Sequence, residues 1–112
     1  AIEYDYSRPV PNFDFMEEQC KADSADFDRT IVCMHAPPFS EQFNNNVAKV
    51  FNYYTHQFPG LMFCLYGHGH HTRQTDLYGD GTMYYQICNA PKHQYYLFTI
   101  TPKGYSYEII DY

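Results

Sequence analysis

Three of the six histidines of this chain fall within four residues, in the segment 67–71 with the sequence GHGHH. Neutral imidazole nitrogen is a good ligand for transition metals such as zinc, iron and manganese. In an extended stretch, side chains at i and i+2 point to the same side, so His68 and His70 are expected to converge on one ion. The glycines Gly67 and Gly69 permit a tight loop around that ion. A histidine-rich surface turn is the alternative interpretation of the same composition.

A fourth histidine lies in a comparable position. His35 follows the apolar run TIVCM, which predicts a buried strand at residues 30–35, and two prolines after it end any regular ladder. The GHGHH segment likewise follows the apolar run LMFCLY, a strand predicted at residues 61–66. A single histidine at a strand end is more often an ordinary hydrogen-bonded residue. With two such segments, we expect one edge of one sheet to present three candidate metal ligands: His35, His68 and His70.

Two helices are predicted beside these strands. Residues 14–24 carry acidic side chains early and a lysine late, which suits a short helix and its dipole, with Asn12 or Asp14 as cap. Residues 41–57 place apolar side chains at helical spacings after Ser40, a good N-cap. Together with the strands, these helices indicate an α+β or layered α/β domain.

The C-terminal third is rich in aromatic and β-branched residues and predicts further strands. Three segments, 83–90, 95–101 and 105–112, are expected to form an antiparallel β-meander, and a Pro-Lys-Gly turn joins the last two. A Gly-Asp-Gly turn at residues 79–81 precedes them. At least five strands are expected in total, and the proline-containing residues 1–13 are interpreted as an extended arm.

Composition limits the classes of function. A chain of 112 residues is one domain or part of one, and its 45% hydrophobic and 20% aromatic content is that of a folded protein. The seven basic residues are scattered singly and the formal net charge is −6, so no nucleic-acid-binding patch is expected. No apolar stretch reaches the ~18 residues of a membrane span, and the chain is not expected to bind a membrane.

The cysteines have neither metal-site nor disulfide spacing. Cys20, Cys33, Cys64 and Cys88 form no CxxC pair, and the last three lie inside apolar runs, which favours buried free thiols. Free thiols favour a cytoplasmic location weakly, and the sequence leaves a periplasmic or secreted location open.

The two histidine-bearing segments, TIVCMHAPPFS and LMFCLYGHGHH, resemble the last two signature blocks of calcineurin-like (purple-acid-phosphatase-like) metallophosphoesterases. In that family one strand ends in a histidine, often before a proline-containing loop, and a later strand ends in Gly-His-x-His. The resemblance covers about residues 13–112. It implies a single partial domain: the C-terminal half of a β-sandwich flanked by helices, ending in an antiparallel meander.

The resemblance also implies a set of metal ligands. His35 and His68 match the histidines that bind the second metal of the family, and His70 matches a ligand of the first. His71 lies outside the pattern, and it is interpreted either as a residue behind the ligands or beside the substrate, or as a solvated side chain. The intact enzyme would use two divalent or trivalent ions (Mn, Fe, Zn or Ni) to hydrolyse a phosphate ester by metal-activated water.

Three motifs of the family are absent from the chain: Asp-x-His, Gly-Asp-x-x-Asp, and Gly-Asn-His followed by Asp or Glu. The bridging carboxylate, the asparagine ligand and the histidine beside the leaving group are therefore missing. The resemblance thus assigns no catalytic residue within this chain, which is expected to be inactive alone, to need the missing N-terminal half, and to self-associate through exposed strand edges. Two alternatives stay open: a non-catalytic metal-binding or interaction domain of the same ancestry, and a mononuclear zinc or nickel site.

Overall fold

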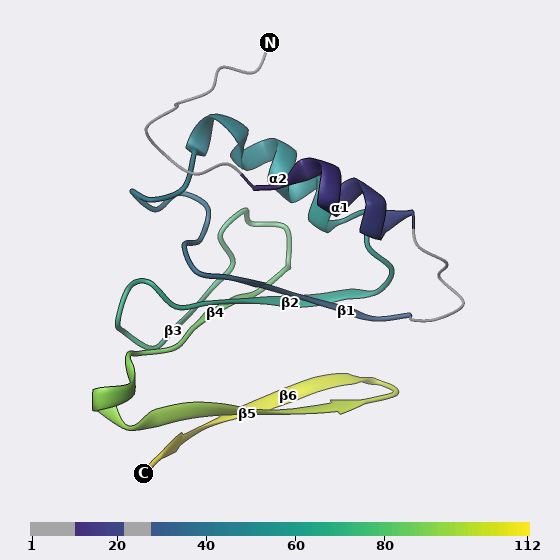
Figure 1. Cartoon of the computed structure of the whole chain (residues 1–112). Coiled ribbons are helices and arrows are strands. Elements are labelled where there is room, and N and C mark those ends of the chain that lie inside the picture. The colour runs from purple at the N-terminus through teal and green to yellow at the C-terminus, as the bar shows by residue number, and fades with distance from the viewer. Residues whose placement is uncertain (1–10, 22–27) are drawn as a thin grey trace.

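A computed structural model describes residues 11–21 and 28–112 and has a mixed α/β architecture, with two α-helices and six strands in two sheets (Figure 1). The elements are α1 (Phe13–Cys20), β1 (Thr30–Met34), the 3₁₀ turn η1 (Asn45–Val47), α2 (Ala48–Thr55), β2 (Leu61–Tyr66), β3 (Arg73–Thr75), β4 (Tyr84–Gln86), the 3₁₀ turn η2 (Ala90–Lys92), β5 (Gln94–Thr101) and β6 (Gly104–Asp111). The mixed α/β class and the expectation of at least five strands are confirmed. The predicted arm lies largely outside the described residues.

The elements form three layers. Figure 1 shows both helices over one face of the four-stranded sheet and the β5–β6 hairpin below the other face. The strand order in the larger sheet is β1-β2-β4-β3, and β1 pairs with β2, and β2 with β4, in parallel. Because α2 lies between β1 and β2 in the chain, these three elements form a βαβ crossover. The C-terminal ends of β1 and β2 therefore meet at one edge of the sheet.

The predicted three-strand meander is wrong in its first strand. β4 pairs in parallel with β2 and antiparallel with β3, and it has no ladder with β5. All three residues of β4 are buried, which is typical of an inner strand covered on both faces. Only β5 and β6 form the expected antiparallel hairpin. The short polar strand β3 was not predicted, because its sequence RQT has no apolar pattern.

The second helix is shorter than predicted, and residues 22–24 of the first predicted helix lie outside the described residues. α1 begins at Phe13, capped by Asn12, whose Oδ1 accepts from the Phe15 N–H at 3.0 Å, and it ends at Cys20. Residues 41–44 are not helical, because the side chain of Asn45 accepts from the Phe39 N–H at 2.7 Å and donates to the Ser40 carbonyl at 3.0 Å. Such local bonds to the backbone compete with helix formation. The predicted Ser40 cap is therefore wrong, and the helix begins later.

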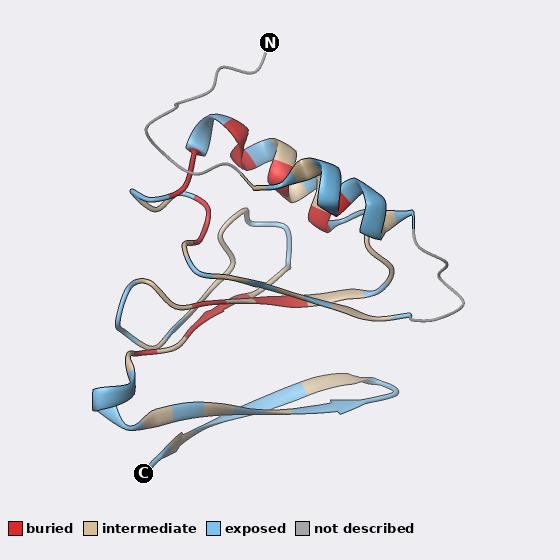
Figure 2. Ribbon diagram, in the orientation of Figure 1, coloured by how far each residue is buried: buried red, intermediate tan, exposed pale blue. Residues whose placement is uncertain are grey.

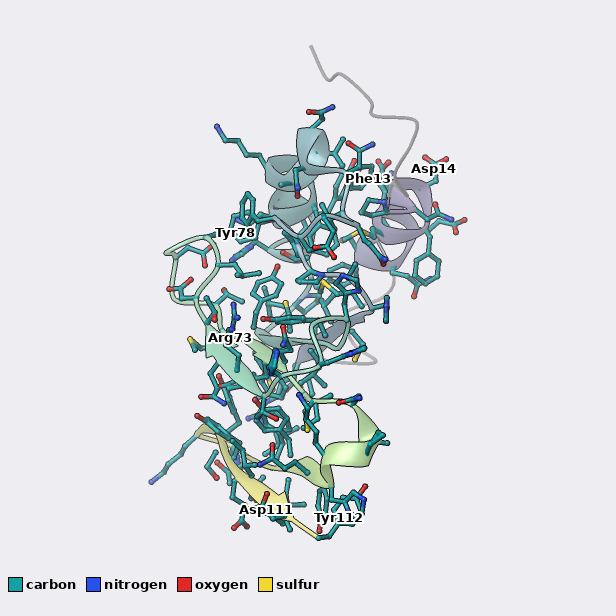
Figure 3. The ribbon with its side chains drawn as sticks, turned by 90° about the vertical axis from the view of Figure 1, so that its left-hand side faces the viewer. Phe13, Asp14, Arg73, Tyr78, Asp111 and Tyr112 are labelled. Atoms are coloured by element: carbon teal, nitrogen blue, oxygen red, sulfur yellow. The ribbon has the colours of Figure 1, made fainter. Side chains whose placement is uncertain are left out.

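Apolar side chains fill the spaces between the layers. Met16, Phe51 and their neighbours form a buried cluster between the helices and the sheet. Tyr78, labelled in Figure 3, lies in the loop before β4. Its hydroxyl donates to the Ala48 carbonyl at 2.7 Å, which connects this loop to α2. Burial is concentrated in the α2 region and in β2 and β4, whereas the hairpin is largely exposed (Figure 2). No helix in the described ranges is long and apolar enough to cross a membrane.

The cysteines differ from the prediction at one position. All four are free; Cys64 and Cys88 are buried as expected, but Cys33 is exposed. Its strand, β1, is an edge strand of the sheet, and the alternate residues Ile31 and Cys33 are the exposed ones. Burial raises the pKa of the Cys64 thiol to about 12, so this thiol is unreactive at neutral pH.

Candidate functional site

His35 and His68 lie side by side at the C-terminal edge of the larger sheet. Met34 and Tyr66, the last residues of β1 and β2, are register partners, and the Gly67 N–H donates to the His35 carbonyl at 3.2 Å. The two imidazole rings have their centroids 5.3 Å apart in an edge-on arrangement. The parallel pairing of the two strands thus brings together histidines that are 33 positions apart in the sequence.

An acidic side chain that the sequence analysis did not single out lies beside this pair. Glu41 lies in the loop after the two prolines, and its Oε1 is 2.7 Å from Nε2 of His68. A carboxylate accepts only, so in this arrangement Nε2 of His68 carries the proton and donates it. A metal that used Nε2 would have to displace the Glu41 carboxylate from this nitrogen. A glutamate in a polar loop resembles any solvated residue, which explains why sequence reasoning missed it.

The histidine loop is not extended, contrary to the expectation. His68 and His70 both have positive φ, 33° and 58°, and the Gly69 N–H donates to the Gly67 carbonyl. The i, i+2 rule that predicted convergence of His68 and His70 therefore does not apply to this segment. His70 is exposed, and the metal-ligand role that the resemblance gives it stays a prediction.

His71 is exposed and lies beside a lysine. Nζ of Lys92 is 3.3 Å from Nδ1 of His71 and donates to the His70 carbonyl at 2.5 Å. The remaining two histidines have partners elsewhere. His56 lies 3.4 Å from the Asp80 carboxylate, and His93 stacks on Tyr112.

The described residues do not make a complete metal centre. Nowhere in residues 11–21 and 28–112 are three or more His, Cys, Asp or Glu side chains arranged to hold a metal ion. His35 and His68 are a pair of good donors on neighbouring strands, so they fit one part of a metal shell.

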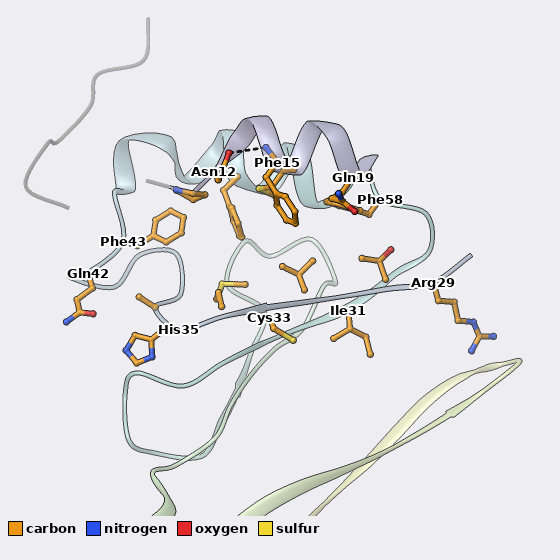
Figure 4. Close-up of a pocket in the computed structure, with 17 residues that line it drawn as sticks. Asn12, Phe15, Gln19, Arg29, Ile31, Cys33, His35, Gln42, Phe43 and Phe58 are labelled. Carbon is orange, nitrogen blue, oxygen red and sulfur yellow. Dashed lines mark hydrogen bonds between the residues drawn. The ribbon is translucent and has the colours of Figure 1, made fainter. Parts of the chain in front are cut away.

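A groove runs along the free side of β1, beneath α1. Its volume is about 730 Å³, and Figure 4 shows His35 at one end and Arg29 at the other. The lining is mostly apolar and includes Phe15, Met16, Val32, Met34, Phe43 and Phe51. The candidate site therefore lies at the mouth of an apolar groove that follows an edge strand.

Comparison of the chain with family models, curated proteins and solved structures finds no match.

Proposed function

We propose that this chain is the C-terminal part of a metal-dependent phosphoesterase and is inactive when isolated. The observation that carries the proposal is the pairing of His35 with His68 at the ends of adjacent parallel strands. The resemblance assigns these two residues to the same metal. When bound, a pair of metal ions activates water and clamps phosphate oxygens for hydrolysis of a phosphate ester. In this proposal His35 and His68 hold one ion and His70 contributes to the other.

The uncovered surfaces support the idea that another part of the same domain is needed. On β1, Ile31 is 38% exposed and lies on the side facing away from the helices. On the hairpin, Ile100 and Tyr107 lie on the same face as Phe98, which stacks on the sheet, yet both remain 40% or more exposed. Apolar side chains on the facing surfaces of the two sheets are therefore found beyond the area in which the sheets touch. In the proposed parent, the N-terminal half covers these faces, pairs with β1 and completes a β-sandwich.

The metal assignment is tested by His68→Ala, alone and combined with His70→Ala, with His93→Ala as a matched control at a distant histidine. Zn²⁺ is titrated into each variant and followed by the imidazole resonances of His35, which is present in all of them; this readout also detects weak binding. Loss of a ligand is expected to weaken Zn²⁺ binding by more than about tenfold, because losing a residue that only hydrogen-bonds a ligand already weakens metal binding by about that factor. Unchanged affinity in the double variant would exclude the assignment.

A non-catalytic interaction domain is the second candidate, favoured by the lack of any three-ligand group among the described residues. An interaction domain is expected to bind no metal, whereas a mononuclear site is expected to hold about one metal ion per chain tightly. Neither is expected to hydrolyse p-nitrophenyl phosphate when the upstream region is restored. The phosphoesterase proposal predicts weak metal binding by the isolated chain and hydrolysis once the missing motifs are supplied.

We also expect the isolated chain to self-associate through β1. This strand has one free edge among the described residues, no charged residue, and the exposed apolar side chain of Ile31. Such edges pair readily with other strands, and a charge placed on them blocks pairing. Sedimentation velocity over a concentration series is expected to show dimers or larger species, which Ile31→Lys converts to monomer. Tyr53→Lys, at an exposed aromatic residue on α2, is the control, and a monomeric wild-type chain at high concentration would contradict the expectation.

A further inference from the structure

Two successive carbonyls of the histidine loop are each hydrogen-bonded by a side chain from a later part of the chain. Nζ of Lys92, on η2, donates to the His70 carbonyl at 2.5 Å. Nε2 of Gln86, the last residue of β4, donates to the His71 carbonyl at 2.5 Å. A loop with left-handed residues at positions 68 and 70 needs outside support, because residues with a side chain adopt that conformation at a cost.

Gln86 is a rigid support. It is 5% exposed, and its backbone pairs with Tyr66 of β2 on one side and Arg73 of β3 on the other. Its amide lies directly against Gly69, where an added Cβ would come within 2.6–2.9 Å of the amide atoms. At Gly67, by contrast, an added Cβ meets nothing within 4 Å. One of the two loop glycines is therefore packed on Gln86, and the other is open.

Lys92 supports the loop from its exposed side. Its ammonium group can only donate, so Nδ1 of His71, 3.3 Å away, is the acceptor and the proton of that imidazole lies on Nε2. The lysine thus fixes both the His70 carbonyl and the ring of His71. His71, which the metal-binding motif left unexplained, acquires a role here as part of the support.

We propose that Lys92 and Gln86 are positioning residues that hold residues 68–71 in the conformation in which His68 lies against His35 and His70 is exposed. The inference rests on the proposed function, because it assigns a purpose to the loop geometry. It goes beyond the metal-ligand pattern, since neither residue is a ligand and both follow the histidines in the chain.

The test compares Lys92→Met, which removes the donor, with Lys92→Arg, which retains a cationic donor. Lys103→Met, at an exposed lysine in the β5–β6 turn, is the matched control. The first measurement, without metal, is amide hydrogen exchange over residues 67–72, which is expected to accelerate about tenfold in Lys92→Met only. The second is the Zn²⁺ titration, in which Lys92→Met is expected to bind about 10- to 100-fold more weakly and Lys92→Arg to recover most of the affinity.

The outcomes separate the two proposals. If Lys92→Met matches Lys103→Met in exchange or in Zn²⁺ affinity while His68→Ala abolishes binding, the positioning role is overturned and the metal assignment survives. If His68→Ala leaves Zn²⁺ affinity unchanged, the proposed function fails, whatever the loop does. Gln86→Glu, which keeps the side-chain shape but removes the amide donor, is a second variant, and it is expected to accelerate exchange at the same residues.

Discussion

Phe63→Ala is expected to lower the free energy of unfolding by about 3–5 kcal/mol, the usual cost of removing a buried phenylalanine from a core. Phe63 is fully buried in β2, where it stacks on Phe98 at 4.4 Å and contacts Tyr105 at 4.5 Å between ring centroids. These aromatic pairs join the four-stranded sheet to the β5–β6 hairpin. Since small domains are stable by only about 5–15 kcal/mol, the variant is expected to lose most of its stability or to unfold.

Urea denaturation followed by near-ultraviolet circular dichroism measures this effect, because the signal reports the packed tyrosine and phenylalanine rings. Phe39→Ala is the control: its ring is 55% exposed and contacts Tyr78, so a cost of about 1 kcal/mol or less is expected. Equal losses in the two variants would mean that the hairpin is not held on the sheet by Phe63.

The strands that carry the site were predictable because their residues are almost uniformly apolar. β2 occupies residues 61–66, as the run LMFCLY predicts, and β1 falls one residue short of its predicted end. Helix starts were less predictable, because the hydrogen bonds of Asn45 to the backbone of the preceding loop delay α2 and leave no mark in the periodicity. The place of β4 was also not predictable, since an aromatic run suits an inner parallel strand as well as a meander.

The site was predictable to the extent that it depends on strand ends. Placing His35 and His68 at the ends of two apolar runs sufficed to expect them at one sheet edge, given right-handed, parallel βαβ geometry. Glu41 and Lys92 could not be found in this way, because they reach the histidines from a loop and from the 3₁₀ turn η2, whose course depends on backbone conformation. The left-handed conformations of His68 and His70 could not be predicted either, because neither position is a glycine.

The geometry of the histidine pair depends on a turn at the opposite end of the same strands. Gly60, just before β2, has φ of 56°, and a Cβ there would lie 2.0 Å from the Asp28 carbonyl oxygen. The turn is fastened to the start of β1, because Thr30 donates its N–H to the Gly60 carbonyl at 3.0 Å and its hydroxyl to the Pro59 carbonyl at 2.8 Å. Any shift of this turn therefore changes how β1 and β2 align.

Gly60→Ala is accordingly expected to destabilise the chain by about 2–5 kcal/mol, the sum of left-handed strain and a clash with backbone that cannot move aside. Gly79→Ala separates the two causes, because Gly79 has φ of 70° but open space around it, and only about 1–2 kcal/mol is expected there. Urea denaturation measures both, and equal losses would show that the clash is relieved. In the Gly60→Ala molecules that remain folded, the nuclear Overhauser contacts between the His35 and His68 rings are expected to weaken, because a site built on two strand ends retains its geometry only while the strands keep their register.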